Sequence, residues 1–202
     1  HYGDDSKVHP DSWSVQRNQG TDDNYANSDL LFAQGRVSGG QEIALKFYHQ
    51  VAKVVVHVRN VGPVYESDDV SVTIGDINNI VMNGTVSTDD MDGNYFNWTQ
   101  GNTMGTITAY SLGPQPLASD GNETSLASFA ALVIPQTVKE NEYYLVINNR
   151  REYSCYASKD IVWKAGHSYT YEVTITKESG VWVNNVIVSP WTPQDGGSLE
   201  TE

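Results

Sequence analysis

Within the segment from residue 163 to residue 191, a run of apolar and polar side chains alternates with a period of two. Between residues 169 and 176 the odd positions are Tyr169, Tyr171, Val173 and Ile175, and the even positions are Thr170, Glu172, Thr174 and Thr176. Successive side chains of an extended strand point to opposite faces, so this pattern predicts a half-buried antiparallel strand over residues 167–176. A second apolar run at residues 181–188 predicts a further strand. These residue types pair and pack, and none of them is chemically reactive.

Short apolar runs recur along the rest of the chain at spacings of about 8–12 residues, and turn pairs such as Asn83-Gly84 and Gly113-Pro114 separate them. They predict strands at residues 30–33, 42–47, 54–58, 70–74, 77–82, 93–98, 106–111, 129–134, 143–147 and 161–163, with one more short strand around residues 13–17. The longest helix-like stretch, Ser125–Leu132, is short. We therefore predict a mainly β fold with little helix, either a sandwich or a barrel of short strands.

The apolar parity changes between two neighbouring runs. Apolar residues of the run 42–47 are odd-numbered, whereas Val54, Val56 and Val58 are even-numbered. A one-residue slip would turn the side chains over, so the segment Tyr48–Lys53 must absorb it. We expect either a β-bulge or a helical turn there.

Charge and composition exclude several classes of partner. The 202 residues include 12 Lys and Arg against 25 Asp and Glu, which gives a net charge of −13. Such an acidic surface repels phosphate backbones, so we expect no nucleic-acid partner. The sequence contains neither a run of 18 apolar residues nor a basic amphipathic segment, so we expect no direct membrane insertion.

The polarity of the chain predicts three parts. Residues 1–41 are polar and rich in aspartate, and we interpret them as a connector and the end of a truncated first β-domain. Residues 42–192 form the predicted β-sandwich domain, and residues 193–202 a polar C-terminal tail. The chain opens at His1 without Met or a signal peptide, which indicates a processed or excised piece.

Catalytic motifs are absent from the sequence. Cys155 is the single cysteine, and its strand-like context is typical of a buried small hydrophobic residue. The five histidines lack metal-ligand spacing, and neither a nucleophile elbow nor a phosphate-binding or dinucleotide-binding glycine motif occurs. We therefore nominate no catalytic residue and no cofactor, and predict that the protein is not an enzyme.

The best metal candidate is the acidic segment at residues 87–94. Asp89, Asp90, Asp92 and Asn94 surround Gly93, and calcium prefers several oxygen ligands on one tight loop. The EF-hand pattern fails, because Gln100 and Gly101 stand where its closing Glu would fall. An ordinary acidic β-turn is favoured, and calcium binding is the weaker alternative.

Two rival functions remain open. Five Trp and twelve Tyr could build a sugar-stacking platform, which would make the protein a surface glycan-binding module of a nutrient-capture system. That module predicts a planar cluster of exposed aromatic side chains. A glycoside hydrolase would instead need two carboxyl groups in a deep cleft, one of them with a raised pKa.

Four segments, in order, resemble elements of the fimbrillin-like proteins of Gram-negative anaerobes. They are Phe47-Tyr48-His49 with Ala52-Lys53-Val54, then Leu132-Val133-Ile134-Pro135-Gln136, then Trp163-Lys164-Ala165-Gly166-His167-Ser168-Tyr169-Thr170-Tyr171, and last Val188-Ser189-Pro190-Trp191. The resemblance implies antiparallel β-sandwich domains of transthyretin-like Greek-key topology, in an exported lipoprotein at the cell surface or outer membrane. It also implies a fimbrial (pilus) subunit or an adhesin, whose partners are other fimbrial subunits or a host surface protein or glycan.

Members of that family assemble when a strand of one subunit fills a groove in its neighbour. Such a strand satisfies free backbone groups and buries alternate side chains. The candidates for strand exchange here are Val181, Val183, Val186 and Val188. Their strand either completes this domain or is lent to a neighbour.

Overall fold

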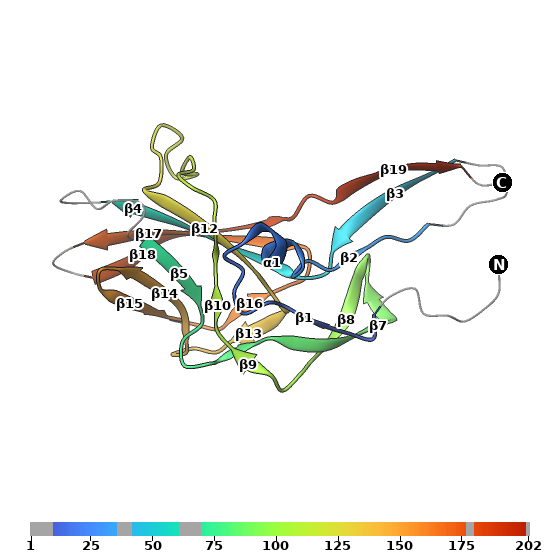
Figure 1. Cartoon of the computed structure of the whole chain (residues 1–202), viewed down its shortest axis with the longest axis horizontal. Coiled ribbons are helices and arrows are strands. Elements are labelled where there is room, and N and C mark those ends of the chain that lie inside the picture. Colours follow the sequence, from blue (N-terminus) through green and yellow to red (C-terminus); the bar gives the residue numbers. More distant parts are fainter. Residues whose placement is uncertain (1–9, 36–41, 61–69, 177–179, 201–202) are drawn as a thin grey trace.

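The computed structural model describes residues 10–35, 42–60, 70–176 and 180–200, and two β-sheets packed face to face form its body (Figure 1). The first has the order β11-β12-β4-β17-β18, with bounds Tyr110–Ser111, Ala127–Val133, Ala52–Asn60, His167–Thr176 and Gly180–Pro190. The second has the order β10-β5-β14-β15, with bounds Ile107–Thr108, Val70–Ile74, Tyr143–Asn149 and Glu152–Tyr156. The predicted mainly β fold with antiparallel sheets is confirmed, and its Greek-key topology stays a prediction.

The hydrophobic core lies between these two sheets. One wall of the core consists of Val54, Val56 and Val58 of β4 and the odd-numbered apolar residues of β17. These side chains face β5 and β14 of the second sheet. The rings of Tyr144 and Tyr171 meet across the core, with centroids 5.4 Å apart. The period-two pattern of residues 169–175 therefore predicted the core-facing side chains correctly. The prediction of a half-buried strand was wrong, because Glu172 and Thr174 on the opposite face are only 0% and 9% exposed.

The centre of the five-stranded sheet departs from a purely antiparallel arrangement. Strand β4 pairs in parallel with β17, from Lys53–Ser168 to Asn60–Ile175. On its other side β4 pairs antiparallel with β12, all seven residues of which are buried. The helix-like stretch at residues 125–132 is thus mostly β-strand, because both faces of β12 are covered and small residues fit between them.

Smaller sheets extend the body. They are β1-β7-β8 (Ser12–Ser14, Asn83–Asp92, Tyr95–Gln100), β19-β3-β2 (Gln194–Glu200, Glu42–His49, Leu31–Phe32), β13-β16 (Gln136–Val138, Ile161–Trp163) and β6-β9 (Ile80–Val81, Met104–Gly105). Strands β3 and β19 project from one end of the body as an arm (Figure 1). The helix α1, Asp22–Ala26, is short, and no helix in the described ranges is long enough to cross a membrane.

The change from odd-numbered to even-numbered apolar residues occurs where the chain passes from one sheet to another. Strand β3 ends at His49 in the arm, and β4 begins at Ala52 in the body. The two residues between them, Gln50 and Val51, are fully buried. The Gln50 side-chain amide donates to the carbonyls of Tyr48 and Asn94, and its oxygen accepts from the N–H of Phe96. The prediction of a bulge or a helical turn was therefore wrong, although its position was right.

Two other local predictions were wrong. Residues 77–79 are not strand, because Ile77 and Asn78 have φ angles of 51° and 55°. Such left-handed values form a tight turn before β6. The Asn83-Gly84 pair, expected to be a turn, begins the ten-residue strand β7. Five strands, β7, β9, β13, β15 and β19, were not predicted, because they are short or polar.

The segment from Trp163 to Tyr171 is held by a defined set of contacts. Trp163 is 1% exposed and donates its indole N–H to the Tyr171 hydroxyl over 3.1 Å. Gly166 has a φ of 65°, and a Cβ there would lie 2.1 Å from the Tyr95 ring. Only glycine fits this position, which explains why the strand-entry turn carries it.

Candidate functional site

Strand β18 forms one edge of the five-stranded sheet and contains a bulge. Its register with β17 shifts between Glu172 and Val173, because Glu172 pairs with Asn185 and Val173 pairs with Val183. Asn184 is therefore an extra residue without a direct partner on β17. Such a bulge changes which residues share a face.

The bulge brings the four strand-exchange candidates onto the same face. Val181, Val183, Val186 and Val188 pair with Ile175, Val173, Tyr171 and Tyr169 respectively. All four of those β17 residues are buried in the core, and directly paired residues point to the same side of a sheet. Val181 and Val183 are odd-numbered whereas Val186 and Val188 are even-numbered, so a regular strand would have divided them between two faces.

These valines line an open groove at the side of the sandwich. The groove has a volume of about 720 Å³ and runs between β18 and the segment 154–162, which contains the end of β15 and most of β16. Val183, Val186 and Val188 are 37%, 49% and 54% exposed. An inward-facing row of apolar side chains with this much exposure lacks the covering layer that the rest of the sheet has.

The opposite wall of the groove is the edge strand β15. The N–H of Asn149 bonds to the carbonyl of Arg151, and the N–H of Ala157 bonds to the carbonyl of Glu142. Because backbone bonds alternate along an antiparallel strand, odd-numbered residues of β15 bond to β14. The backbone groups of Glu152, Ser154 and Tyr156 then point toward the open edge, where an added strand could pair with them.

Two titratable groups of the groove, Cys155 and Tyr171, are buried. Burial raises the pKa of the Cys155 thiol to about 11. Burial also raises the pKa of Tyr171 to about 12, although a hydrogen bond from Trp163 opposes the change. Cys155 is buried, which confirms its prediction as a buried small residue. A thiol that stays protonated is also a poor nucleophile.

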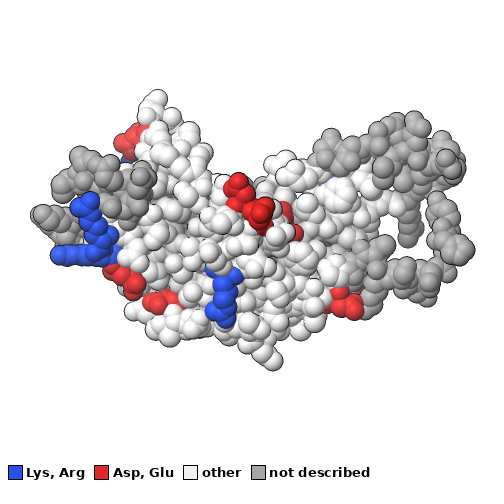
Figure 2. Space-filling view, in the orientation of Figure 1, with Lys and Arg blue, Asp and Glu red and all other residues white. Residues whose placement is uncertain are grey.

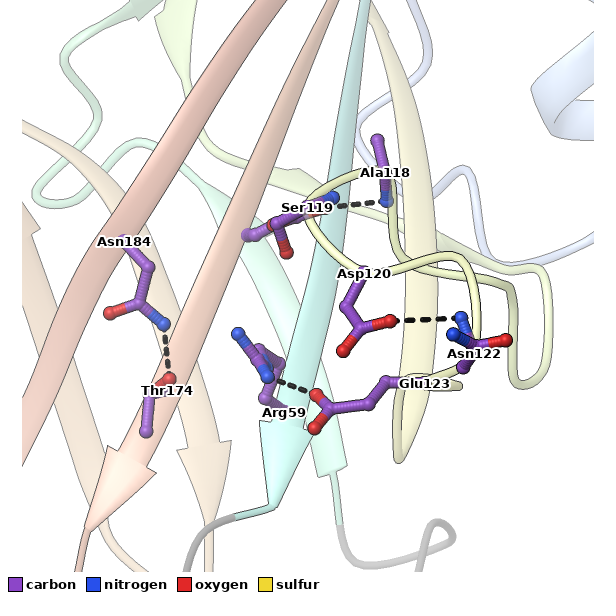
Figure 3. Close-up of polar contacts among 9 residues, drawn as sticks. Arg59, Ala118, Ser119, Asp120, Asn122, Glu123, Thr174 and Asn184 are labelled. Carbon is purple, nitrogen blue, oxygen red and sulfur yellow. Dashed lines mark hydrogen bonds and ion pairs between the residues drawn. The ribbon is translucent and has the colours of Figure 1, made fainter.

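The outer face of the same sheet carries a polar cluster under the loop at residues 112–126. Glu172, fully buried, accepts from the backbone N–H groups of Ala118 and Ser119 over 2.8 and 3.1 Å. Beside it, His57 Nδ1 lies 2.7 Å from the Ser128 hydroxyl. Arg59 forms an ion pair with Glu123 of the loop, as Figure 3 shows.

Electrostatics in this cluster keep Glu172 charged. Burial raises the pKa of its carboxyl, but hydrogen bonds from Ser119 and Ala118 and the nearby His57 outweigh that effect, so the pKa lies below its usual value. Burial lowers the pKa of His57, against the opposing influence of Glu172. Ser128 is fully buried. A hydroxyl that a substrate cannot reach does not act as a nucleophile. The polar cluster therefore holds the loop at residues 112–126 against the sheet.

The acidic segment proposed for calcium lies at the β7–β8 hairpin. Asp89 and Asp92 are exposed on β7, and Asn94 lies in the turn. The side chain of Asp90 lies outside what the structure describes. Within the described ranges, no group of three His, Cys, Asp or Glu side chains could hold a metal ion. Calcium binding stays a prediction.

Charge does not concentrate on the face shown in Figure 2. Lys and Arg side chains are scattered there among Asp and Glu, without a continuous basic patch. A phosphate backbone would need such a patch. This face therefore offers nothing that would favour a nucleic-acid partner.

The residues that sequence reasoning missed are Asn184, Glu172 and Arg59. One signal could have located the bulge, namely the change from odd to even valines within residues 181–188. Glu172 and Arg59 carried no such signal, because their partners lie in a loop more than 50 residues away in the sequence.

Comparison with known proteins gives one family and several structures. The sequence pattern of the fimbrillin-like family matches residues 2–191. No curated protein matches the chain.

Two similar solved structures are proteins of Bacteroides species. A candidate cell adhesion protein of Bacteroides ovatus aligns with a TM-score of 0.63 and 16% identity, over 91% of this chain and 61% of its own. A candidate cell adhesion protein of Bacteroides uniformis aligns with a TM-score of 0.51 and 20% identity, over 73% of this chain and 53% of its own. At these identities the likeness establishes the fold. The chain spans less than two thirds of either structure.

Proposed function

Since this chain belongs to the fimbrillin-like family over residues 2–191, we propose that it is a non-catalytic structural or adhesive protein of the cell surface. It acts as a fimbrial subunit or a fimbrillin-like adhesin and assembles with other subunits by β-strand complementation. Its place is a fimbrium at the outer membrane, reached through export as a lipoprotein. Its β-sandwich spans residues 42–192, after the end of a preceding β-domain.

The observation that carries this proposal is the groove between β15 and β18. Four valines of β18 face it, and three of them are more than a third exposed. A strand added to β15 would bond to the backbone of Glu152, Ser154 and Tyr156 and would cover those valines with its own alternate side chains. One incoming strand would thus cover the apolar surface and form hydrogen bonds with the free backbone groups.

Burial of these valines contributes to a stable joint. Covering an aliphatic side chain fully contributes about 1.5–3 kcal/mol, and Val183, Val186 and Val188 are 37–54% exposed, so together they contribute about 2–5 kcal/mol. The cost of association is about 4–15 kcal/mol, so the apolar side chains and backbone bonds of the incoming strand must contribute the rest. Strand β18 itself stays paired with β17 in this arrangement and serves as the receiving wall.

Substitutions on alternate residues of β18 test the proposal. We expect Val186→Lys with Val188→Lys to abolish incorporation of the full-length protein into surface fibres, as seen by immunogold electron microscopy and by oligomer ladders in unheated gels. Ile187→Lys, on the opposite face of the same strand, is the matched control and should leave assembly unchanged. Equal loss with both, or normal assembly of the double variant, would refute complementation at this groove.

A disulfide separates the receiving role of β18 from a lending role. Thr170 and Ile187 pair directly across β17 and β18, and the Cα atoms of directly paired antiparallel residues lie about 4.5–5.5 Å apart, within the Cα separation that a disulfide spans. With Thr170→Cys and Ile187→Cys in a Cys155→Ala background, β18 cannot leave its own sheet. We expect the oxidised protein to assemble as well as the reduced protein. Assembly only after reduction would show that β18 is lent.

A further inference from the structure

The outer face of the five-stranded sheet presents an exposed tryptophan beside a row of polar groups. Trp182 is 57% exposed and pairs with Thr174 across β17 and β18. Thr174 in turn pairs with Arg59 on β4. Directly paired residues share a face, and Val58 and Val173 point inward, so Arg59, Thr174 and Trp182 form a row across three strands of the outer face. At about 4.8 Å between strands, that row is about 10 Å long.

The β-bulge adds an amide to this row. Asn184 is the extra residue of the bulge and donates its side-chain N–H to the Thr174 hydroxyl. Figure 3 shows Asn184 reaching toward Thr174 over the surface of the sheet. Bulges at sheet edges commonly re-aim a side chain in this way. Here the bulge directs Asn184 to the outer face while it returns the valines to the inner one.

The loop over β4 bounds the row on its far side. Glu123 holds Arg59, and Asp120 and Asn122 lie beside them in Figure 3. The loop itself is fixed from below, because Glu172 binds the N–H groups of Ala118 and Ser119. The polar groups at this end therefore have defined positions, and most of them are exposed.

We propose that this row is a glycan-binding site, with Trp182 as its stacking platform. A sugar ring has a face of C–H groups that packs on an indole, and its hydroxyls bond to planar polar groups such as amides, carboxylates and guanidinium. Trp182 supplies the platform, Asn184, oriented by the buried Thr174, bonds to the stacked ring, and Arg59 with Glu123 bonds to the next one. Arg59 and Asn184 lie on the face opposite the valine groove, and Trp182, on the edge strand, also borders that groove. The site does not use the backbone edge of β15, to which an added strand would pair.

Charge selects neutral glycans for this site. The guanidinium of Arg59 is already paired with Glu123, and Asp120 and Glu172 lie nearby. The chain as a whole carries a net charge of −13. A sialylated or sulfated glycan would meet repulsion here, whereas a neutral oligosaccharide would not.

Titration of the purified protein with defined oligosaccharides tests this inference. The probes are lacto-N-tetraose, an N-acetyllactosamine dimer and maltohexaose, with 3′-sialyllactose as the acidic comparison. Isothermal calorimetry and quenching of tryptophan fluorescence measure binding. We expect saturable binding of at least one neutral probe with a Kd between about 10 μM and 1 mM. Binding of 3′-sialyllactose should be weaker.

Variants locate the binding on the outer face. Trp182→Ala should weaken binding at least tenfold, and Asn184→Ala several-fold. Trp182→Phe keeps a flat ring and should retain part of the affinity, which guards against an effect of misfolding. Tyr156→Ala, an exposed aromatic on the groove side, is the matched control and should bind like the wild type. The inference is overturned if no neutral probe binds at about 10 mM, if only 3′-sialyllactose binds, or if Trp182→Ala binds like the wild type.

Discussion

The imidazole of His49 and the indole of Trp191 stack face to face, with ring centroids 3.4 Å apart and planes inclined by 1°. His49 Nδ1 lies 2.8 and 3.0 Å from the two carboxylate oxygens of Asp29, which orients the ring. Trp191 donates its backbone N–H to Gly166 over 2.7 Å. This stack fixes the place where the chain leaves β18 for β19, opposite the place where β3 leads into β4.

Replacing Trp191 tests how much the stack with His49 contributes to the free energy of unfolding. We expect Trp191→Ala to lower the free energy of unfolding by about 1–3 kcal/mol, because a partly buried indole loses its packing partner. Urea denaturation followed by circular dichroism measures the change. Trp182→Ala removes an exposed indole and should change stability by less than about 0.5 kcal/mol. Equal losses in both variants would contradict a structural role for the stack.

A buried glutamine clamps two segments that no sheet connects. The side chain of Gln136 accepts from the N–H of Val81 and donates to the carbonyls of Val81 and Ile134. We expect Gln136→Leu to cost about 3 kcal/mol of unfolding free energy, because buried backbone groups lose their partners. Gln100→Leu removes one exposed bond to Pro135 and is the control, with an expected cost below about 0.5 kcal/mol. Thermal and urea unfolding of both variants provide the comparison.

Stability should fall at alkaline pH. Burial raises the pKa of Cys155 to about 11, and burial also raises the pKa of Tyr144 far above its usual value. A group whose pKa is higher in the folded state stabilises the fold below its unfolded pKa and loses that contribution as pH rises through the folded one. The free energy of unfolding should therefore be level from pH 7 to about 8.5 and then decline, with on the order of 2 kcal/mol lost to Cys155 by pH 11.

The variant Cys155→Ala separates the ionisation of Cys155 from other causes of lost stability at alkaline pH. The variant should be less stable at every pH because a cavity forms, yet its decline above pH 9 should be shallower. Reaction of the thiol with a disulfide reagent gives a second measure. The folded protein should react far more slowly at pH 8 than the urea-unfolded chain. An equal rate in both states would contradict the raised pKa.

Deleting Asn184 should disrupt the edge of the sheet. Without the extra residue, either Val181 and Val183 or Val186 and Val188 must turn to the outer face. We expect a loss of about 2 kcal/mol or more in unfolding free energy and faster hydrogen exchange along β18. Asn184→Ala keeps the register and should stay within about 0.5 kcal/mol of the wild type. An unaffected deletion variant would show that the bulge does not set the faces of β18.

Sequence reasoning predicted strands that carry apolar side chains and failed for polar ones. The alternation at residues 169–175 predicted β17 and its inward face, because apolar residues face the second sheet while polar Glu172 and Thr174 lie on the other side. The strand predicted at residues 129–134 matches most of β12, although its small residues also gave a helix-like stretch from 125 to 132. The polar strand β19 gave no apolar signal, because its pairing with β3 rests on backbone bonds.

Local patterns of side chains were thus enough to establish a β-protein with an apolar strand at residues 181–188, since strand periodicity is a property of neighbouring residues alone. Which face of β18 the valines occupy depends on the register with β17, and that register includes the bulge at Asn184. The groove depends on two edge strands meeting side by side, and the polar row depends on Arg59, Thr174 and Trp182 aligning across three strands. These residues come from distant parts of the sequence, and only the packing of the sheets brings them together.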